Sequence, residues 1–191
     1  MSHDDERTPP RRIRIGKLEE VQVADLVKVD RACAEMYWLL GFDAAEVPTR
    51  SSNEFYQLPR NHAVRVAEAD YNVAGFVAWR DEAPGIAYVE DIGVHPDYQR
   101  FGVGRKLMER VFEEAREAGF TEIALRAWDK VDFVQAFYKK LGFSRFEPGS
   151  ASNPEKLALW YEEKTAGDRP FLRPDESVLW RAVPAADEEE D

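Results

Sequence analysis

The sequence predicts an α/β or α+β domain in which helices flank a mixed β-sheet. Segments whose apolar residues alternate, as in a strand, interleave along the chain with segments whose apolar residues recur at helical spacing. Several of the predicted helices end at a glycine, where the chain can leave the helix. The 191 residues, of which 44% are hydrophobic and 33% charged, fit one globular domain with a sizeable core.

The first half of the chain predicts one long helix and four strands. Val21 to Leu40 carries apolar residues at helical spacing and ends at Gly41. The region 42–61 mixes prolines and serines with aromatic residues, so we expect irregular structure around a short helical turn. Asp70-Tyr71-Asn72 predicts a hairpin turn between two alternating segments. The strands are expected at 12–15, 62–68, 73–79 and 86–94.

The second half predicts helices and strands in alternation. Here the hydrophobic period changes to that of amphipathic helices, whose charged residues face outward. Short apolar segments between the helices predict further strands. The helices are expected from Val103 to a stop at Gly119, from Val134 to Leu141, and from a start at Ser152, Pro154 and Glu155 to about Lys164; the strands are expected at 123–125, 143–146 and 177–183.

The negative charge of the chain is concentrated at its two ends. The formal net charge is -11, with 37 acidic and 26 basic residues. The N-terminal residues Asp4, Asp5 and Glu6 and the run 187–191 are acidic, and the chain between them is close to balanced. We therefore expect disordered tails at 1–11 and 184–191 around a single domain at 12–183.

Composition excludes several classes of partner. The folded part carries no clustered basic face, so nucleic acid is not expected as a main partner. No apolar run reaches the ~18–20 residues of a membrane span, and the first residues do not resemble a signal peptide. The single Cys33 allows no internal disulfide, and the three histidines lack metal-ligand spacing. We expect a cytoplasmic protein that binds neither membrane nor metal.

The segment Val94-His95-Pro96-Asp97-Tyr98-Gln99-Arg100-Phe101-Gly102-Val103-Gly104 lies between a predicted strand and a predicted helix. Glycines at a helix start leave backbone N–H groups open to an anion, and the helix dipole adds partial positive charge. Arg100, Arg105 and Lys106 add formal charge. The segment therefore predicts a phosphate-binding loop, although a bare Gly-x-Gly also occurs in turns that bind nothing.

This segment resembles the acyl-CoA signature of the GNAT superfamily of N-acetyltransferases, Gln/Arg-x-x-Gly-x-Gly/Ala after a Val-x-Pro. Gln99 to Gly104 matches every defined position, and Ala136 to Phe143 is similar to the Phe-Tyr-x-Lys-x-Gly-Phe helix end of the family. The resemblance implies a mostly antiparallel sheet of about seven strands with one splayed strand pair. It also implies acetyl-CoA as cosubstrate, and the family's frequent pairing through late strands makes a homodimer conceivable.

The resemblance assigns cofactor contacts to two stretches of this chain. We call residues 99–105 the glycine loop. The pyrophosphate of acetyl-CoA would lie on the backbone of residues 100–104, with Arg105 beside it. The pantetheine would pair with the end of the preceding strand. Many members carry an asparagine near the next helix, where this chain has Asp129-Lys130-Val131-Asp132, so that contact is not transferred. The expected cofactor-binding residues are Ile92, Gly93, Val94, Gln99, Arg100, Phe101, Gly102, Val103, Gly104 and Arg105.

Two catalytic residues are expected. Amine acetylation needs a base for the amine proton and an acid for the departing thiolate. Glu90 and Asp91 are adjacent carboxylates in an apolar strand that resembles the strand of polyamine acetyltransferases, which implies Glu90 as base and Asp91 as a contact for a cationic substrate. Tyr138 matches the family tyrosine near the CoA sulfur and is expected to be the acid. The alternative is two structural carboxylates and a core aromatic.

The resemblance implies an acceptor site in and before the region 42–61, which we call the variable region. Its candidate contacts are Tyr37, Trp38 and Tyr56, and the alternative for each aromatic is packing in the core. Cys33 is read as an ordinary core residue. The reading that we favour is transfer of an acetyl group to a small cationic amine, such as a polyamine or an aminosugar. The alternatives are a protein lysine or N-terminal acetyltransferase and a non-catalytic acyl-CoA-binding module.

Overall fold

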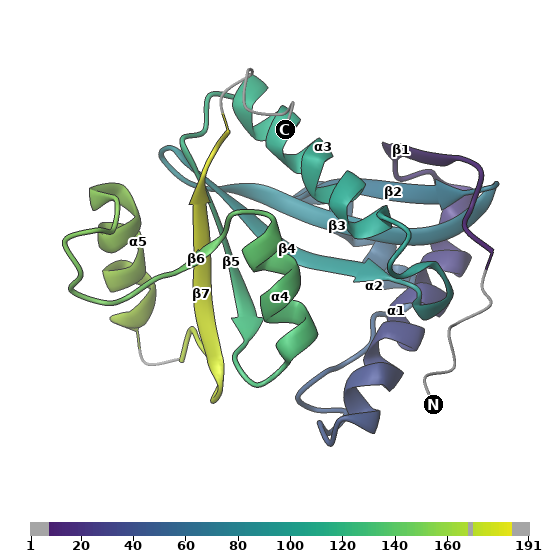
Figure 1. Ribbon diagram of the computed structural model, residues 1–191, viewed down its shortest axis with the longest axis horizontal. Coiled ribbons are helices and arrows are strands. Elements are labelled where there is room, and N and C mark those ends of the chain that lie inside the picture. Colours follow the sequence, from purple (N-terminus) through teal and green to yellow (C-terminus); the bar gives the residue numbers. More distant parts are fainter. Residues whose placement is uncertain (1–7, 168–169, 185–191) are drawn as a thin grey trace. The chain divides into compact units, whose positions relative to one another are not determined.

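The structure is a computed structural model that describes residues 8–167 and 170–184. Its strands form a seven-stranded sheet in the order β1-β2-β3-β4-β5-β7-β6 (Figure 1). The β1–β2, β5–β7 and β6–β7 pairs are antiparallel and the β4–β5 pair is parallel, so the predicted mixed sheet is confirmed. The strands are β1 (Ile13–Lys17), β2 (Ala63–Ala69), β3 (Asn72–Ala83), β4 (Ile86–Val94), β5 (Glu122–Trp128), β6 (Ser144–Arg145) and β7 (Glu176–Ala182).

The helices follow the predicted order. β5 is longer and β6 shorter than predicted, and α5 begins after an N-cap at Pro154, so Ser152 lies outside it. No helix in the described part of the chain is long and apolar enough to cross a membrane. The helices are α1 (Val23–Leu39), α2 (Ser52–Gln57), α3 (Val103–Glu117), α4 (Asp132–Lys140) and α5 (Glu155–Thr165).

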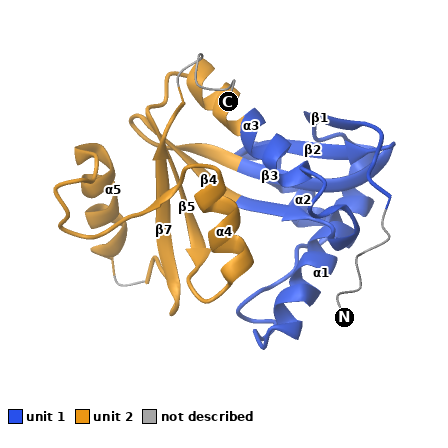
Figure 2. Cartoon of the chain, viewed as in Figure 1, with its two compact units in different colours: residues 1–78, 91–110 blue, residues 79–90, 111–191 orange. Residues whose placement is uncertain are grey.

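The chain divides into two compact units (Figure 2). Unit 1 comprises residues 1–78 and 91–110, and unit 2 comprises residues 79–90 and 111–191. The units interleave in sequence because β3, β4 and α3 each contribute residues to both. The expectation of one domain at 12–183 stays a prediction. The predicted tails fall largely on 1–7 and 185–191, which lie outside the described residues.

The core of unit 1 joins α1 and α2 to strands β2 and β3. The α1 stripe of Val23, Leu26 and Val29 is buried, as its helical spacing predicts. Phe55 of α2 is fully buried and meets Phe76 of β3 edge to face, with ring centroids 5.3 Å apart. The short helical turn expected in this region is thus present as α2, and its Phe55 anchors the region to β3.

The core of unit 2 is built around Tyr88 of β4. Its ring lies 5.9 Å from the ring of Trp160 on α5 and 6.5 Å from that of Phe171, centroid to centroid. Ala124 of β5, Val178 of β7 and apolar residues of α5 complete this cluster. The C-terminal helix is thus packed against the β4, β5 and β7 strands of its unit.

Two glycines allow β3 and β4 to approach closely in unit 1. A Cβ atom added to Gly75 would lie 2.6 Å from the carbonyl oxygen of Gly93, and one added to Gly93 would lie 2.8 Å from the Phe76 ring. The first obstacle is backbone, which cannot rotate away as a flexible side chain can. The close approach keeps the end of β4 against β3.

We predict that Gly75→Ala destabilises the protein by about 1–3 kcal/mol, because the new methyl group forces the strands apart. Gly16→Ala is the matched control, since a Cβ at Gly16 in β1, a strand of the same sheet, meets nothing within 4 Å. Urea denaturation of both variants measures the difference. Equal stabilities for the two variants would contradict the prediction.

Candidate active site

The loop after β4 has the geometry of an anion-binding helix start. A 3-10 turn at Pro96–Tyr98 is followed by Arg100 with φ 70° and Gly102 with φ 83°, both in the left-handed region. Left-handed residues at a turn orient successive N–H groups toward one side. The backbone N–H of Lys106 donates to the carbonyl of Gly102 at 3.0 Å and opens the ladder of α3. The N–H groups of the three residues between them, 103–105, therefore precede that ladder.

Gln99 closes this loop onto the end of β4. Its Nε2 donates to the carbonyl oxygen of Val94 at 2.9 Å and lies 3.2 Å from the Met36 sulfur. Cys33 donates its thiol to the same Val94 oxygen at 3.3 Å. The sequence predicted Gln99 and Val94 as cofactor contacts, and in this structure the Gln99 amide and the Val94 carbonyl hold the loop in place.

The parallel ladder between β4 and β5 joins Ile86–Val89 to Glu122–Leu125, and both strands continue past it. Ile92 and Gly93 lie in the part of β4 beyond this ladder. Gly93 is buried between Phe76 and Cys33, so its missing side chain serves close packing. These are the backbone positions that were predicted to pair with the cofactor, and that pairing stays a prediction.

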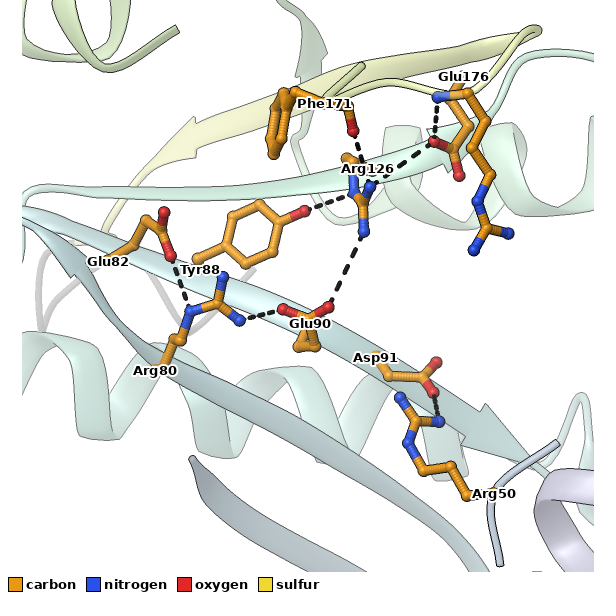
Figure 3. A network of polar contacts seen from close by, with 10 residues as sticks. Arg50, Arg80, Glu82, Tyr88, Glu90, Asp91, Arg126, Phe171 and Glu176 are labelled. Atoms are coloured by element: carbon orange, nitrogen blue, oxygen red, sulfur yellow. Dashed lines mark hydrogen bonds and ion pairs between the residues drawn. The ribbon is translucent and has the colours of Figure 1, made fainter. Parts of the chain in front are cut away.

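Glu90 lies between two guanidinium groups (Figure 3). Arg80 of β3 donates Nη1 to one carboxylate oxygen, and Nη2 of Arg126 on β5 lies 3.8 Å from the other. The Glu90 side chain is 26% exposed. The predicted base is therefore an ion-paired carboxylate at a partly accessible position.

Arg126 connects Glu90 to the segment before β7. Its Nε donates to the Tyr88 hydroxyl at 2.9 Å, and its Nη1 donates to the Phe171 carbonyl at 2.8 Å and lies 3.9 Å from Glu176 (Figure 3). Burial raises the pKa of Tyr88, the Arg126 charge opposes that shift, and the Glu90 charge adds to it. Arg126 is thus held by Tyr88, by the Phe171 carbonyl and by Glu176, in addition to Glu90.

Asp91 has a different partner from its neighbour. Arg50, which follows the variable region's first turn, binds Asp91 and lies 3.3 Å from an oxygen of Asp30 on α1. The backbone N–H of Arg50 also donates to Asp30 at 2.6 Å. We call Asp30, Arg50 and Asp91 the Arg50 cluster; it holds two carboxylates and one guanidinium.

The field of this cluster extends to α1. Burial raises the pKa of Tyr37, and the charge of Asp91 raises it further. Burial likewise raises the pKa of Cys33 to about 12, with added contributions from Asp91 and Asp30. Burial is also the largest cause of the raised pKa of Asp30, although the bonds from Arg50 oppose it. The structure thus places Tyr37 close enough to Asp91 for the carboxylate charge to affect the Tyr37 hydroxyl.

The other predicted aromatics have separate surroundings. Trp38 donates its indole N–H to the Val47 carbonyl at 3.2 Å and so closes the turn after α1, while Tyr56 is 48% exposed on α2. Tyr138 of α4 is 6% exposed and packs edge to face on Phe137 and Phe143, at centroid distances of 5.1 and 5.4 Å. The roles predicted for these side chains are not tested by this geometry.

Asp129 stands where many relatives were expected to carry asparagine. It accepts hydrogen bonds from Arg145 at 2.8 and 3.1 Å and from the Ser177 hydroxyl at 2.6 Å. Its carboxylate therefore links the end of β5 to β6 and β7 within unit 2.

The model of the Acetyltransferase (GNAT) family matches residues 31–143, which is more than half of the chain. The chain belongs to the GNAT acetyltransferase family. The match spans Arg50, Glu90, Asp91, the glycine loop and α4, so the family resemblance stated from the sequence is confirmed.

Individual relatives of this GNAT acetyltransferase agree. It is 25% identical over 138 residues to an uncharacterized N-acetyltransferase, ycf52, of Pyropia yezoensis, covering 72% of each chain. It is 30% identical over 131 residues to the N-alpha-acetyltransferase RimI of Mycobacterium tuberculosis, covering 66% of this chain and 80% of that protein. The PaiA N-acetyltransferase of Thermoplasma acidophilum, solved with coenzyme A, shares the fold with a TM-score of 0.67 at 15% identity, over 90% of this chain and 99% of that one.

Sequence reasoning missed the arginines of this GNAT acetyltransferase. Arg50, Arg80 and Arg126 supply the counter-charges of Glu90 and Asp91. The sequence feature that indicates them is that Arg80 and Arg126 are cations at or within apolar strands, where an unpaired charge is costly. A carboxylate and a guanidinium in neighbouring apolar strands indicate an ion pair, but the sequence does not give the strand register that brings the two together.

We predict that Cys33 reacts slowly with the thiol reagent DTNB in the folded protein. With its pKa raised to about 12, the thiolate fraction at pH 8 falls about 10³-fold relative to an ordinary thiol of pKa ~8.5. The same titration in guanidinium chloride, where the chain is unfolded, is the control and should restore fast reaction. Equal rates in both conditions would refute the prediction.

Proposed function

We propose that this GNAT acetyltransferase transfers the acetyl group of acetyl-CoA to a primary amine, which attacks the thioester directly within a ternary complex. The observation that carries the proposal is the loop of residues 99–105, with left-handed Arg100 and Gly102 ahead of α3 in the family's signature segment. The neighbour solved with coenzyme A supports the same donor. Acetyl-CoA is a substrate here, so no resident cofactor is required.

The glycine loop supplies the groups that a pyrophosphate needs. The N–H groups of Val103, Gly104 and Arg105 precede the α3 ladder, and the positive end of the helix dipole lies there. Arg100 is exposed beside them. The Arg105 guanidinium is bound to Glu109 at 2.6 Å, so part of its charge is already compensated. Backbone donors therefore carry most of the proposed recognition.

Glu90 and Tyr138 are assigned the two proton transfers. The amine nitrogen forms a bond to the acetyl carbon, Glu90 accepts the proton that the nitrogen loses, either directly or through a water molecule, and the C–S bond breaks. Tyr138 gives its proton to the sulfur that leaves. Arg80 and Arg126 lie beside the Glu90 carboxylate and compensate its charge at a position that is 26% exposed.

The Arg50 cluster favours a cationic acceptor. Two carboxylates share one guanidinium, so the cluster keeps one net negative charge. The charge of Asp91 raises the pKa of both Cys33 and Tyr37 beyond the effect of burial, and the charge of Asp30 adds to the shift of Cys33. A protonated amine or a second ammonium group on the acceptor is stabilised in such a field. The polyamine-like or aminosugar-like acceptor is proposed on this ground.

A protein α-amino group is the second candidate acceptor. The relative from Mycobacterium tuberculosis, 30% identical over 131 residues, is named as an N-alpha-acetyltransferase. A peptide N-terminus is also a primary amine that is protonated in part at neutral pH. The chemistry assigned to Glu90 and Tyr138 is the same for both acceptors.

The deciding experiment is thiol release from acetyl-CoA with a panel of polyamines, aminoglycosides and peptides with free N-termini, with CoA binding measured by calorimetry. Release that depends on a small cationic amine supports the first acceptor class, and release that depends on peptides supports the second. CoA binding without release on any acceptor would favour a binding module. No CoA binding would overturn the proposal.

We predict that Glu90→Gln and Tyr138→Phe each lower kcat by about 10²-fold or more, the usual contribution of a general base or acid. CoA binding should persist in both variants. Glu35→Gln, which removes an exposed carboxylate paired with Arg31, is the control for loss of a surface ion pair. Full activity of Glu90→Gln would remove Glu90 from the mechanism.

We predict that Asp91→Asn raises the KM for cationic amines about tenfold, because the Arg50 cluster then loses its excess negative charge. The KM for an aromatic amine that is uncharged at the assay pH should stay within about twofold. Steady-state kinetics with both acceptors tests the difference. An equal rise for both would point to a structural role of Asp91.

A further inference from the structure

A series of partly buried ion pairs and hydrogen bonds leads from Lys164 of α5 to Glu90. It passes through Glu82 of β3, whose side chain is 4% exposed. Glu82 binds Lys164 of α5, accepts from the indole N–H of Trp160 at 3.3 Å and accepts from Nε of Arg80 at 2.7 Å. Burial raises the pKa of Glu82, but the hydrogen bonds from Lys164, Trp160 and Arg80 and the charge of Arg80 together outweigh burial, so the pKa lies below the ordinary value. Glu82 is therefore ionised near neutral pH.

Glu82 orients the guanidinium of Arg80, and this guanidinium in turn orients the carboxylate of Glu90. Its Nε is bound to Glu82, and its Nη1 is bound to Glu90 (Figure 3). The guanidinium is planar, so fixing Nε fixes the direction in which Nη1 points. Its carbon also lies 5.0 Å from the centre of the Tyr88 ring, which supports the plane on one side.

Glu90 is held asymmetrically as a result. Arg80 binds one carboxylate oxygen directly, whereas Arg126 faces the other at 3.8 Å, longer than a hydrogen bond. Of these two arginines, Arg80 is the one that makes a hydrogen bond to Glu90. A glutamate that must meet a proton donor in one geometry gains from such a constraint, because its free side chain has several rotamers.

We propose that Arg80, anchored by Glu82 and through it by α5, is a positioning residue that holds the Glu90 carboxylate in the orientation used to accept the amine proton. The inference rests on the proposed function and gives α5 a part in it. Arg80 does not touch the reacting atoms; it acts through Glu90. Among the residues that the structure describes, the charged groups joined by these ion pairs in unit 2 are Arg80, Glu82, Glu90, Arg126, Lys164 and Glu176.

The test is a double-mutant cycle on kcat with Arg80→Met and Glu90→Gln. Arg80→Met alone should lower kcat about tenfold while the KM for acetyl-CoA changes less than about twofold. In the Glu90→Gln background it should lower kcat less than about twofold further, because a positioning residue has no effect once the group it positions is gone. Arg31→Met, which removes an exposed partner of Glu35, is the matched control and should leave kcat unchanged.

Two further variants keep the test decisive if Arg80→Met folds poorly. Arg80→Lys keeps the charge but has no planar fork, so it should give an intermediate kcat. Glu82→Gln removes the anchor without touching Glu90 and should lower kcat in the same way, again without further loss in Glu90→Gln. Thermal unfolding of each variant identifies those that are folded.

The outcomes separate the inference from the proposed function. A loss of kcat for Arg80→Met that disappears in the Glu90→Gln background supports the positioning role. An undiminished loss in that background, or full activity of Arg80→Met while Glu90→Gln is inactive, overturns the inference and leaves the base assignment intact. Full activity of Glu90→Gln overturns the base assignment, and the positioning role with it.

Discussion

Strand β4 holds two adjacent, partly buried carboxylates in an otherwise apolar segment, and their charges need partners. Many of the described polar contacts supply those partners or hold them in place. A buried charge without a partner costs several kcal/mol, far more than one such contact contributes when it is made. Glu90 and Asp91 each obtain a guanidinium partner, Glu90 from Arg80 and Asp91 from Arg50. Arg80 lies on the neighbouring strand β3, whereas Arg50 lies outside the sheet and 41 residues from Asp91, so the Asp91 pair connects the strand to a loop that the sheet does not include.

The arginines transmit that organisation to the surroundings of the site. Arg50 draws the variable region onto α1 through Asp30, and its backbone N–H makes the contact independent of the side chain. In unit 2, Arg126 ties the segment at Phe171 and Glu176 to Tyr88, while Arg80 continues through Glu82 to α5. Each connection is partly buried, where an ion pair is screened less than on the surface. Elements peripheral to the sheet are thereby joined to the strand that carries the proposed base.

The proposed donor site and the proposed acceptor site follow different physical rules. The glycine loop offers backbone N–H groups, whose positions depend on left-handed Arg100 and Gly102 and on the Gln99 bond to Val94. The Arg50 cluster offers charge, whose effect depends on burial and on an unequal number of carboxylates and guanidiniums. Backbone geometry is shared readily among relatives of low identity, whereas side-chain charge varies. This is why family membership supports the donor more strongly than it supports any one acceptor.

The sequence by itself determined the order of the helices and strands, the hairpin at Asp70-Tyr71 and the glycine loop, because each depends on local periodicity or on the conformational freedom of a few consecutive residues. It also indicated Glu90 and Asp91, since charges in an apolar strand are conspicuous. Only the tertiary structure decided what those charges meet. Arg80 lies 10 residues from Glu90 and Arg50 lies 41 residues from Asp91. Strand register and the return of a loop onto α1 bring these pairs together, and neither leaves a local trace in the sequence.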